Sequence, residues 1–360
     1  MTKRLYTKIA GTGSYIPTRK IGNDYFNNYT FFDPCTKLPF EKSNDEIIQK
    51  FKEITNIKER RWITDDMHNS DMAALAVKDA FESANIDPET LDFIIVAHNF
   101  GDVDINSTRV DILPSLANKV KSKLNILNPA CFCHDLISGC PGWTQGMITA
   151  DAYIRSGMAK RGVVVGTDVL SRISDPHDRD TMIYADGAGA TIVEAIESDE
   201  PVGILSHSSR SDSVNYWNLL TNGNSFNPEL NDNDQYIKMA GHKLYVYALT
   251  YVPGVVKDSI DKAGLHLSNI KKVIIHQANE KMDEAILKNV FKLYNEKQIP
   301  EGIMPMSIEK LGNSSTATVP TLLDTILKGR MEGQSINPGD HILLCSVGAG
   351  MNINSIVYKV

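Results

Sequence analysis

Apolar runs rich in β-branched residues recur along the chain, with helix-like segments between them. Residues 93–97 (FIIVA) and 273–277 (VIIHQ) lack the strict alternation of apolar and polar positions that marks a half-exposed strand. Continuous runs of this kind are typical of strands that are buried on both faces of a parallel sheet. Because such strands alternate with helices here, the pattern predicts a layered α/β fold with mainly parallel sheets.

The apolar pattern also repeats within the chain. One constant offset of 179 residues carries Val77 onto Val256. Three pairs of segments match at this offset: 76–99 with 255–278, 163–167 with 342–346, and 140–141 with 319–320. We therefore expect a tandem duplication, with an N-terminal half over residues 1–199 and a C-terminal half over residues 200–360. A cleft between two such halves is the natural place for a functional site.

A glycine motif lies near the start of the chain. Residues 10–17 (AGTGSYIP) contain two glycines of the kind found in dinucleotide-binding loops. The third glycine of that motif is absent, and Pro17 would block the helix that should follow it. We therefore interpret Gly11 and Gly13 as part of a turn that ends a strand.

The composition is that of an ordinary globular protein, with 42% hydrophobic and 22% charged residues. The net charge of −7 argues against nucleic acid as a bulk partner, although an acidic protein could still dock on a local basic patch. Residues 1–17 contain no apolar stretch long enough for a signal peptide or a membrane span, so we expect neither export nor membrane insertion. The five cysteines are then expected to be reduced thiols in the cytoplasm.

Cys140 stands directly before Pro141 in the segment 135–143 (DLISGCPGW). Proline is tolerated in the first turn of a helix, so the sequence predicts a helix that begins at Pro141 with the cysteine at its mouth. Unpaired N–H groups and the helix dipole would lower the pKa of a thiol there and favour the nucleophilic thiolate. An inert buried cysteine is the alternative interpretation.

Three further features could serve such a thiolate. His276 ends an apolar run at a position where the other copy has Ala97, so the architecture itself does not require an imidazole. Asn313 lies among small hydroxyl residues in 311–320 (LGNSSTATVP), where it could contact a ligand or simply form a turn. The glycine-rich residues 346–352 could form an anion-binding nest or only end a strand.

A zinc site is a competing interpretation of the cysteines. Cys131, Cys133 and His134 lie close together in the sequence, with Cys140 nearby. Their spacing is poor for a set of zinc ligands, and no second Cys-x-x-Cys or His pair follows. A zinc-binding interaction protein stays a hypothesis that a metal assay would separate from an enzyme.

Taken in this order, the motifs resemble the β-ketoacyl-[acyl carrier protein] synthase III family of the thiolase superfamily over nearly the whole chain. The segments that carry the resemblance are 55–62 (TNIKERRW), 135–143, 166–190 (beginning GTDVL), 276–279 (HQAN), 311–320 and 346–350 (SVGAG). The resemblance implies a thiolase-like duplicated α/β fold with five layers, α-β-α-β-α. It also implies an acyltransferase that needs no metal and no redox cofactor and that forms a homodimer.

The family's catalytic triad falls on Cys140, His276 and Asn313. The resemblance implies that Cys140 takes the acyl group from a thioester, while the backbone N–H groups of Cys140 and Ala349 hold the oxyanion. His276 and Asn313 would then donate hydrogen bonds to a malonyl thioester as it loses carbon dioxide. The implied substrates are an acyl-CoA or acyl-carrier protein and malonyl-carrier protein.

Other positions match family residues that hold the substrate or a partner. Gly241 and Asn279 match contacts to the pantetheine arm, and Arg179 matches a basic residue that stacks on the CoA adenine. Lys281 matches a basic position used for docking of acyl carrier protein. Leu113 matches the residue that closes the acyl pocket of the dimer partner, where the family usually has an aromatic side chain.

The sequence also departs from the family. The adenine-stacking tryptophan is replaced at about Lys50, and extra residues occur at 101–111 and 213–235, where we expect the rim of the acyl tunnel. The leading hypothesis is the initiating condensation of fatty acid synthesis. The runner-up is a specialised ketosynthase of secondary metabolism, as in dialkylresorcinol or polyketide formation, that uses longer acyl or β-ketoacyl donors.

Overall fold

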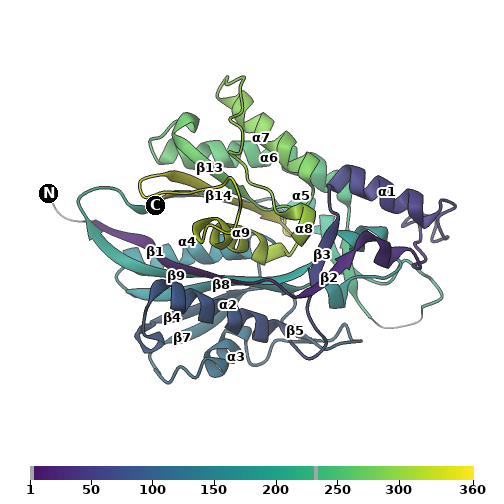
Figure 1. The fold of residues 1–360 in the computed structure, drawn as a ribbon, viewed down its shortest axis with the longest axis horizontal. Helices are drawn as coiled ribbons and strands as arrows, with labels where there is room; N and C mark the ends of the chain where they lie inside the picture. Colours follow the sequence, from purple (N-terminus) through teal and green to yellow (C-terminus); the bar gives the residue numbers. More distant parts are fainter. Residues whose placement is uncertain (1–3, 231–233) are drawn as a thin grey trace.

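The computed structural model describes residues 4–230 and 234–360, which are built around two central sheets (Figure 1). The first sheet has the order β1 (Arg4–Tyr15), β9 (Asp186–Ser198), β8 (Arg161–Val169), β4 (Phe93–Ala97) and β7 (Phe132–Leu136). The second sheet has the order β10 (Gly203–Ser211), β15 (Asn352–Lys359), β14 (His341–Gly348) and β13 (Ile270–Ile275). The two apolar runs are therefore strands, although β13 ends before His276.

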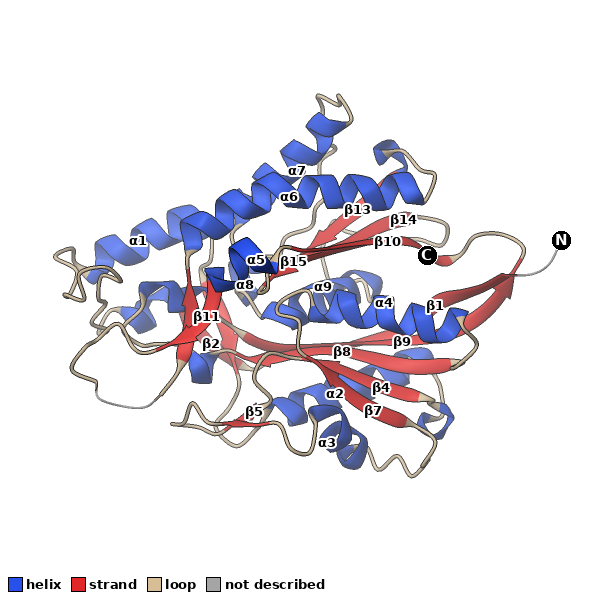
Figure 2. Ribbon diagram, turned by 180° about the vertical axis from the view of Figure 1, so that it is seen from behind, coloured by secondary structure: helices blue, strands red, loops and turns tan. Residues whose placement is uncertain are grey.

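Helices separate and cover the two sheets, so that helix and sheet layers alternate (Figures 1 and 2). From one outer layer to the other, the helices are α2 (Asn69–Ala84) and α3 (Leu116–Lys123), α4 (Gly142–Arg155) and α9 (Thr318–Leu327), and α6 (Gly241–Lys262) and α7 (Glu280–Leu293). The layered α/β architecture predicted from the apolar pattern is confirmed.

The two sheets share one plan. β4 pairs with β8 in parallel, as β13 does with β14, and in each sheet the next strand is antiparallel. The order and direction of the strands thus repeat between the halves, in keeping with the offset of 179 residues in the sequence. β7 has no counterpart in the second sheet as far as the structure describes the chain. The predicted boundary at residues 199 and 200 falls in the connection from β9 to β10, and the division into two domains stays a prediction.

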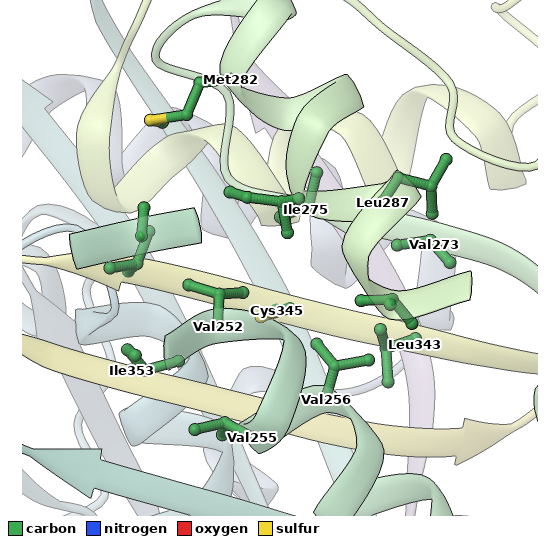
Figure 3. Close-up of a cluster of buried hydrophobic side chains, with 14 of the residues drawn as sticks. Val252, Val255, Val256, Val273, Ile275, Met282, Leu287, Leu343, Cys345 and Ile353 are labelled. Carbon is green, nitrogen blue, oxygen red and sulfur yellow. The ribbon is translucent and has the colours of Figure 1, made fainter. Parts of the chain in front are cut away.

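Helices α4 and α9 occupy the middle layer because they are apolar on the faces toward both sheets. Trp143, Met147, Leu322 and Ile326 belong to one buried cluster that also includes strand residues of both sheets. On the outer face of the second sheet, α6 and α7 pack against β13 and β14 through side chains such as Val256 (Figure 3). These two clusters fix the positions of the strands in both sheets. The candidate functional site lies where several of these strands end.

The prediction of a turn at Gly11 and Gly13 is wrong, because both residues lie inside β1. A Cβ on Gly13 would collide with the backbone carbonyl of Ala76 in α2. The glycine is needed for close approach between a strand and a helix, which a turn-forming glycine does not require.

Short hairpins and helices surround the ends of the sheets. They are β2 (Arg19–Gly22) with β3 (Glu59–Trp62), β5 (Asp102–Val103) with β6 (Val110–Asp111), β11 (Leu220–Gly223) with β12 (Tyr236–Met239), and α1 (Asn44–Thr55), α5 (Ser213–Tyr216) and α8 (Ile308–Leu311). β5, β6, α5 and β11 fall within the two segments of extra residues. Within the described ranges, no helix is long and apolar enough to cross a membrane.

Candidate active site

Cys140 follows β7 and lies just before α4. The helix begins at Gly142, and Pro141 is its N-cap, so the helix starts one residue later than the sequence analysis predicted. The reason is local, because Pro141 has a helical φ of −74° but a ψ of 8° and only leads into the first turn. Cys140 as a residue is half-buried, and it lines a cavity.

The turn between β14 and β15 packs against the backbone of Cys140. A Cβ on Gly139 would lie 2.7 Å from the nitrogen of Ala349, and a Cβ on Gly348 would lie 2.6 Å from the nitrogen of Cys140. Glycine is required at both positions because a side chain would separate the two segments. The backbones of Cys140 and Ala349 are therefore adjacent at one wall of the cavity, an arrangement that an oxyanion hole needs.

His276 comes directly after β13, and its backbone N–H donates to the carbonyl of Cys345 at 2.8 Å. The residue is 3% exposed, and burial lowers the pKa of the imidazole to about 4. The ring is therefore neutral at physiological pH. Its Nδ1 is buried and has no hydrogen-bond partner in the described part of the chain, which is uncommon for a buried polar atom.

Asn313 lies between α8 and α9 and is held by the N-terminal half. Its backbone N–H donates to the carbonyl of Ile183 at 3.0 Å, and its carbonyl accepts from the N–H of Ala185 at 2.9 Å. Its side-chain Oδ1 accepts from the N–H of Ser315 at 2.8 Å. Because Oδ1 is already engaged, the amide NH₂ is the end of the side chain that can donate to a ligand.

Cys140, His276 and Asn313 line one cavity of about 260 Å³. The apolar part of its lining is formed by Phe100, Leu170, Leu220, Ile237, Met239, Leu244, Ala278, Met282 and Val347. The structure thus brings together three predicted residues from distant segments, in mostly apolar surroundings. Their catalytic roles stay a prediction.

A larger cavity of about 770 Å³ adjoins the first one. The residues that the two cavities share are Met239, Leu244, Ala278, Met282 and Asn313. Residues of α1, α6 and α7 supply its outer walls. The larger cavity, which we call the channel, lies next to the Cys140 cavity, and the pair suits an extended substrate whose reactive end reaches Cys140.

Three residues predicted to hold the substrate line this channel, namely Arg179, Gly241 and Asn279. Gly241 begins α6, and Asn279 is the N-cap of α7, so the side chain of Asn279 also caps a helix. The guanidinium of Arg179 lies 4.9 Å from the ring centroid of Phe40. Phe40 lies ten residues before Lys50, the approximate position of the family's missing tryptophan, so the segment before α1 still supplies an aromatic partner to Arg179.

Two predicted residues line neither cavity. Lys281 is exposed in the first turn of α7, next to residues that wall the channel. Leu113 is 87% exposed on the connection between β6 and α3. A side chain so exposed does not close the pocket of its own chain, so its predicted role concerns a second subunit.

The pKa of Cys140 differs from the prediction. Burial raises the pKa of this thiol to about 11, whereas the start of a helix was expected to lower it. Loss of solvation outweighs the hydrogen bond that the hydroxyl of Ser315 donates to Sγ at 3.3 Å. The carboxyl of Asp168 raises the pKa further. The thiol is therefore mainly protonated at neutral pH before substrate binds.

The zinc hypothesis finds no supporting cluster. Cys131 is buried just before β7, and Cys133 and His134 are successive residues of that strand, so their side chains point to opposite faces. The ring of His134 is parallel to that of Phe132, with centroids 6.2 Å apart. In the described residues, no three His, Cys, Asp or Glu side chains are grouped to hold a metal ion.

Sequence models of one family match both halves of the chain. The model of 3-oxoacyl-[acyl-carrier-protein (ACP)] synthase III matches residues 134–213, and the model of its C-terminal part matches residues 260–360. Together these matches cover half of the chain. The chain belongs to the 3-oxoacyl-[acyl-carrier-protein] synthase III family. It is therefore a condensing enzyme of the acyltransferase class, as the resemblance predicted.

Solved structures related to this family superimpose on nearly the whole chain. The 3-oxoacyl-[acyl-carrier-protein] synthase III of Aquifex aeolicus is 29% identical, with a TM-score of 0.78 over 98% of this chain and 100% of the other. That of Thermus thermophilus is 28% identical, with a TM-score of 0.77 over 98% and 99%. The priming β-ketosynthase of the R1128 polyketide pathway is 23% identical and shares the fold, with a TM-score of 0.79 over 100% and 98%. The predicted thiolase-like fold is confirmed.

Four residues of the site were not predicted from the sequence: Asn99, Asp168, Tyr184 and Ser315. Asn99, Tyr184 and Ser315 line the Cys140 cavity. Asn99 and Asp168 lie at or near the ends of buried strands, and Ser315 lies in the same hydroxyl-rich segment as Asn313. These are weak signals, because many polar residues at strand ends and turns only end an element.

Proposed function

We propose that this family member is a β-ketoacyl-[acyl carrier protein] synthase III that initiates fatty acid synthesis. It condenses an acyl-CoA or acyl-carrier-protein primer with malonyl-carrier protein through an acyl-cysteine on Cys140. One observation carries the proposal. A thiol next to a buried helix, an imidazole and a primary amide share the mostly apolar lining of one cavity, and the channel adjoins it.

In the first step, the sulfur of Cys140 attacks the thioester carbonyl of the primer. A new bond forms between sulfur and the acyl carbon, and the donor's thiol leaves with the thiol proton of Cys140. The N–H groups of Cys140 and Ala349 stabilise the oxyanion, and one such donor contributes about 3–4 kcal/mol in the transition state. The thioester that results keeps the acyl group activated for the second step.

In the second step, malonyl-carrier protein loses carbon dioxide, and its carbanion attacks the acyl-cysteine. Negative charge develops on the malonyl thioester oxygen, to which His276 and Asn313 donate hydrogen bonds. The low pKa of His276 suits this role, because a neutral imidazole donates an N–H without adding a positive charge that would hold the malonyl carboxylate. The β-ketoacyl product leaves on the carrier protein, and Cys140 is released.

The substrate arm follows the larger cavity past Gly241 and Asn279, and Arg179 contacts the adenine of CoA. Lys281, on the exposed first turn of α7, meets an acidic acyl carrier protein. The exposed apolar side chains of Ile112 and Leu113 support assembly as a homodimer. In that dimer, Leu113 closes the acyl pocket of the other subunit.

Intact-protein mass spectrometry tests the proposal. Wild type and Cys140→Ala are incubated with donors from acetyl-CoA to long-chain acyl-carrier protein. We expect one acyl adduct per chain in wild type and none in Cys140→Ala. Cys345→Ala is the matched control, because it removes a buried thiol from the hydrophobic cluster between the second sheet and α6 and α7. This variant is expected to form the adduct as wild type does. An adduct that persists in Cys140→Ala contradicts the proposal.

A specialised ketosynthase that takes a β-ketoacyl donor is the second candidate, and one observation favours it. Tyr184 lines the Cys140 cavity, and its hydroxyl is buried without a hydrogen-bond partner among the described residues. Leaving such a group unpaired costs about 1–3 kcal/mol, so the hydroxyl indicates a ligand that supplies the partner. A β-ketoacyl chain carries an oxygen near the thioester, whereas a saturated primer does not.

The variant Tyr184→Phe separates the two candidates, because it removes only the hydroxyl. If the donor is a β-ketoacyl thioester, its self-acylation rate constant falls about tenfold in the variant, while saturated donors react as before. The two donors have equal chain length, and mass spectrometry of reactions quenched at set times measures the acyl adduct. If Tyr184→Phe reacts with both donors at the wild-type rates, the support for the specialised enzyme is lost.

A further inference from the structure

Ser315 contacts two residues of the proposed triad and lines the same cavity as the third. Its hydroxyl donates to Sγ of Cys140 at 3.3 Å, and its backbone N–H donates to Oδ1 of Asn313 at 2.8 Å. Its backbone raises the pKa of the nearby His276 imidazole, against the larger effect of burial. The residue is buried and lines the cavity. Ser315 therefore lies at the centre of the site.

The hydroxyl of Ser315 is oriented by its own neighbours. Nδ2 of Asn99 donates to Oγ of Ser315 at 2.9 Å and to the carboxylate of Asp168 at 2.8 Å. The backbone N–H of Asn99 donates to the same carboxylate at 2.8 Å, and the hydroxyl of Thr316 does so at 2.9 Å. Because Asn99 already supplies a hydrogen to Oγ, the hydrogen of the hydroxyl is directed at the sulfur of Cys140.

The backbone at Ser315 points to the same conclusion. Its φ of +53° lies in the left-handed region, which residues other than glycine rarely adopt. Glycine would be the least strained residue at this position, so a serine indicates that the side chain is needed. The short 3-10 turn η7 (Ser315–Ala317) runs directly into the buried helix α9, which holds the strained residue in place.

We propose that Ser315 is a further catalytic residue, whose hydroxyl stabilises the thiolate of Cys140 during attack on the acyl donor, and that Asn99 positions this hydroxyl. The inference rests on the proposed function, because it takes Cys140 as the nucleophile. As the bond between Sγ and the acyl carbon forms, the carbon–sulfur bond of the donor breaks, and the thiol proton of Cys140 ends on the departing thiol. Ser315 keeps its own proton and gives only a hydrogen bond, which is stronger to a thiolate than to a thiol.

The electrostatics of the site agree with this role. Burial and the carboxyl of Asp168 both raise the pKa of Cys140. The hydrogen bond from Ser315 is the largest of the effects that lower it, ahead of the backbone of Cys140 itself. Without the hydroxyl, little would remain to favour the thiolate in this apolar cavity.

Alkylation of Cys140 by iodoacetamide, followed by peptide mass spectrometry from pH 6 to pH 10, tests the inference. Ser315→Ala removes the hydroxyl. Ser315→Gly also removes it and, in addition, relieves the backbone strain that the positive φ imposes on a residue with a side chain. Both variants are expected to react about tenfold more slowly at pH 8, the effect of about one pKa unit. Asn99→Ala is expected to react about threefold more slowly, because the hydroxyl remains but is no longer oriented.

Ser314→Ala is the matched control. This neighbouring serine lies 3.3 Å from the hydroxyl of Thr318 and lines neither cavity, so its loss leaves the alkylation rate unchanged. If Ser315→Gly reacts as wild type does, the serine serves only the turn, and the inference is wrong. Unchanged rates in both Ser315 variants overturn it as well.

The proposed function is tested separately by self-acylation of wild type. Acylation at Cys140 together with unchanged reactivity of the Ser315 variants overturns only the role of Ser315. A wild type that never acylates at Cys140 overturns the proposed function itself. Slower alkylation and slower self-acylation in both Ser315 variants, with unchanged circular dichroism, support both.

Discussion

The middle layer contains two equivalent helices, and only one of them follows a cysteine. α4 in the N-terminal half comes after Cys140, whereas the offset of the duplication carries that position onto Val319 of α9. A strand, β7, leads to α4. In the C-terminal half, the described residues form no matching strand, and α8 and η7 precede α9 instead. This segment contains Asn313 and Ser315.

The difference explains how two similar copies form one site. A strand would pair with its own sheet, but the segment before α9 bonds to the N-terminal half. The backbone of Asn313 pairs with Ile183 and Ala185, and Thr316 donates to the carboxylate of Asp168. The C-terminal half thereby brings polar side chains to a thiol that belongs to the other half.

The ends of the equivalent strands differ in the same way. Ala97 ends β4, and a Cβ on Gly142 would lie 3.0 Å from the Cβ of Ala97, so α4 packs closely on this strand end. A larger side chain at residue 97 would push α4 away. His276, the equivalent residue after β13, lines the cavity instead. An imidazole therefore fits in only one of the two copies.

Removal of the side chains that the C-terminal half contributes to the site is expected to have the largest effect on activity. His276→Ala and Asn313→Ala each remove one donor to the malonyl oxygen, so malonyl decarboxylation falls by about 10²–10³-fold. Self-acylation of Cys140 falls far less, because the backbone donors of Cys140 and Ala349 remain. Release of labelled carbon dioxide and the acyl adduct measure the two half-reactions. Equal losses in both would contradict the division of roles between the halves.

The equivalence of the two buried helices can be tested at Met147 of α4 and Ile326 of α9, which match at the offset of 179 residues and lie in one cluster. Truncation to alanine leaves a cavity, so each variant is expected to lose about 2–5 kcal/mol of unfolding free energy. Urea unfolding measures this loss. Leu327→Ala, at an exposed position, is the control. A loss below about 1 kcal/mol in one helix would show that the two are not equivalent supports.

The two halves pack closely at Gly166 of β8, where a Cβ would collide with the backbone carbonyl of Thr316. Gly166→Ala must displace η7, so we expect a loss of about 1–3 kcal/mol in unfolding free energy, together with reduced condensation. Gly254→Ala in α6 has no atom within 4 Å of the new Cβ and is the control, with unchanged or higher stability. Wild-type stability of Gly166→Ala would argue against this close packing.

The smallest effect concerns pH. Burial lowers the pKa of His276 from 6.5 to about 4, so the unfolded chain binds a proton below pH 6.5 and the folded chain does not. The contribution of the neutral ring to stability is therefore complete above pH 6.5 and is lost as the pH falls toward 4. From pH 7.5 to pH 5.5, wild type is expected to lose about 1 kcal/mol more than His276→Asn in urea unfolding. Identical losses would show that the ring is not kept neutral.

Local patterns in the sequence were sufficient for much of the fold. A β-branched run needs burial on both faces, and residues 93–97 are β4 within the predicted bounds. Pro141 located the start of α4 to within one residue. The prediction of a turn at Gly11 and Gly13 was wrong. In a single sequence, a glycine that allows a helix to approach a strand cannot be distinguished from a glycine that forms a turn.

By itself, the sequence determined the layered α/β fold, the repeat, and the residue types at the site, because Cys140, His276 and Asn313 are reactive groups at the ends of recognisable elements. The tertiary structure alone decided how Asn99 and Ser315 surround the thiol and how its pKa shifts. Hydrogen bonds and loss of solvation depend on distances between segments that are remote in the chain, and those distances exist only once the two halves have packed together.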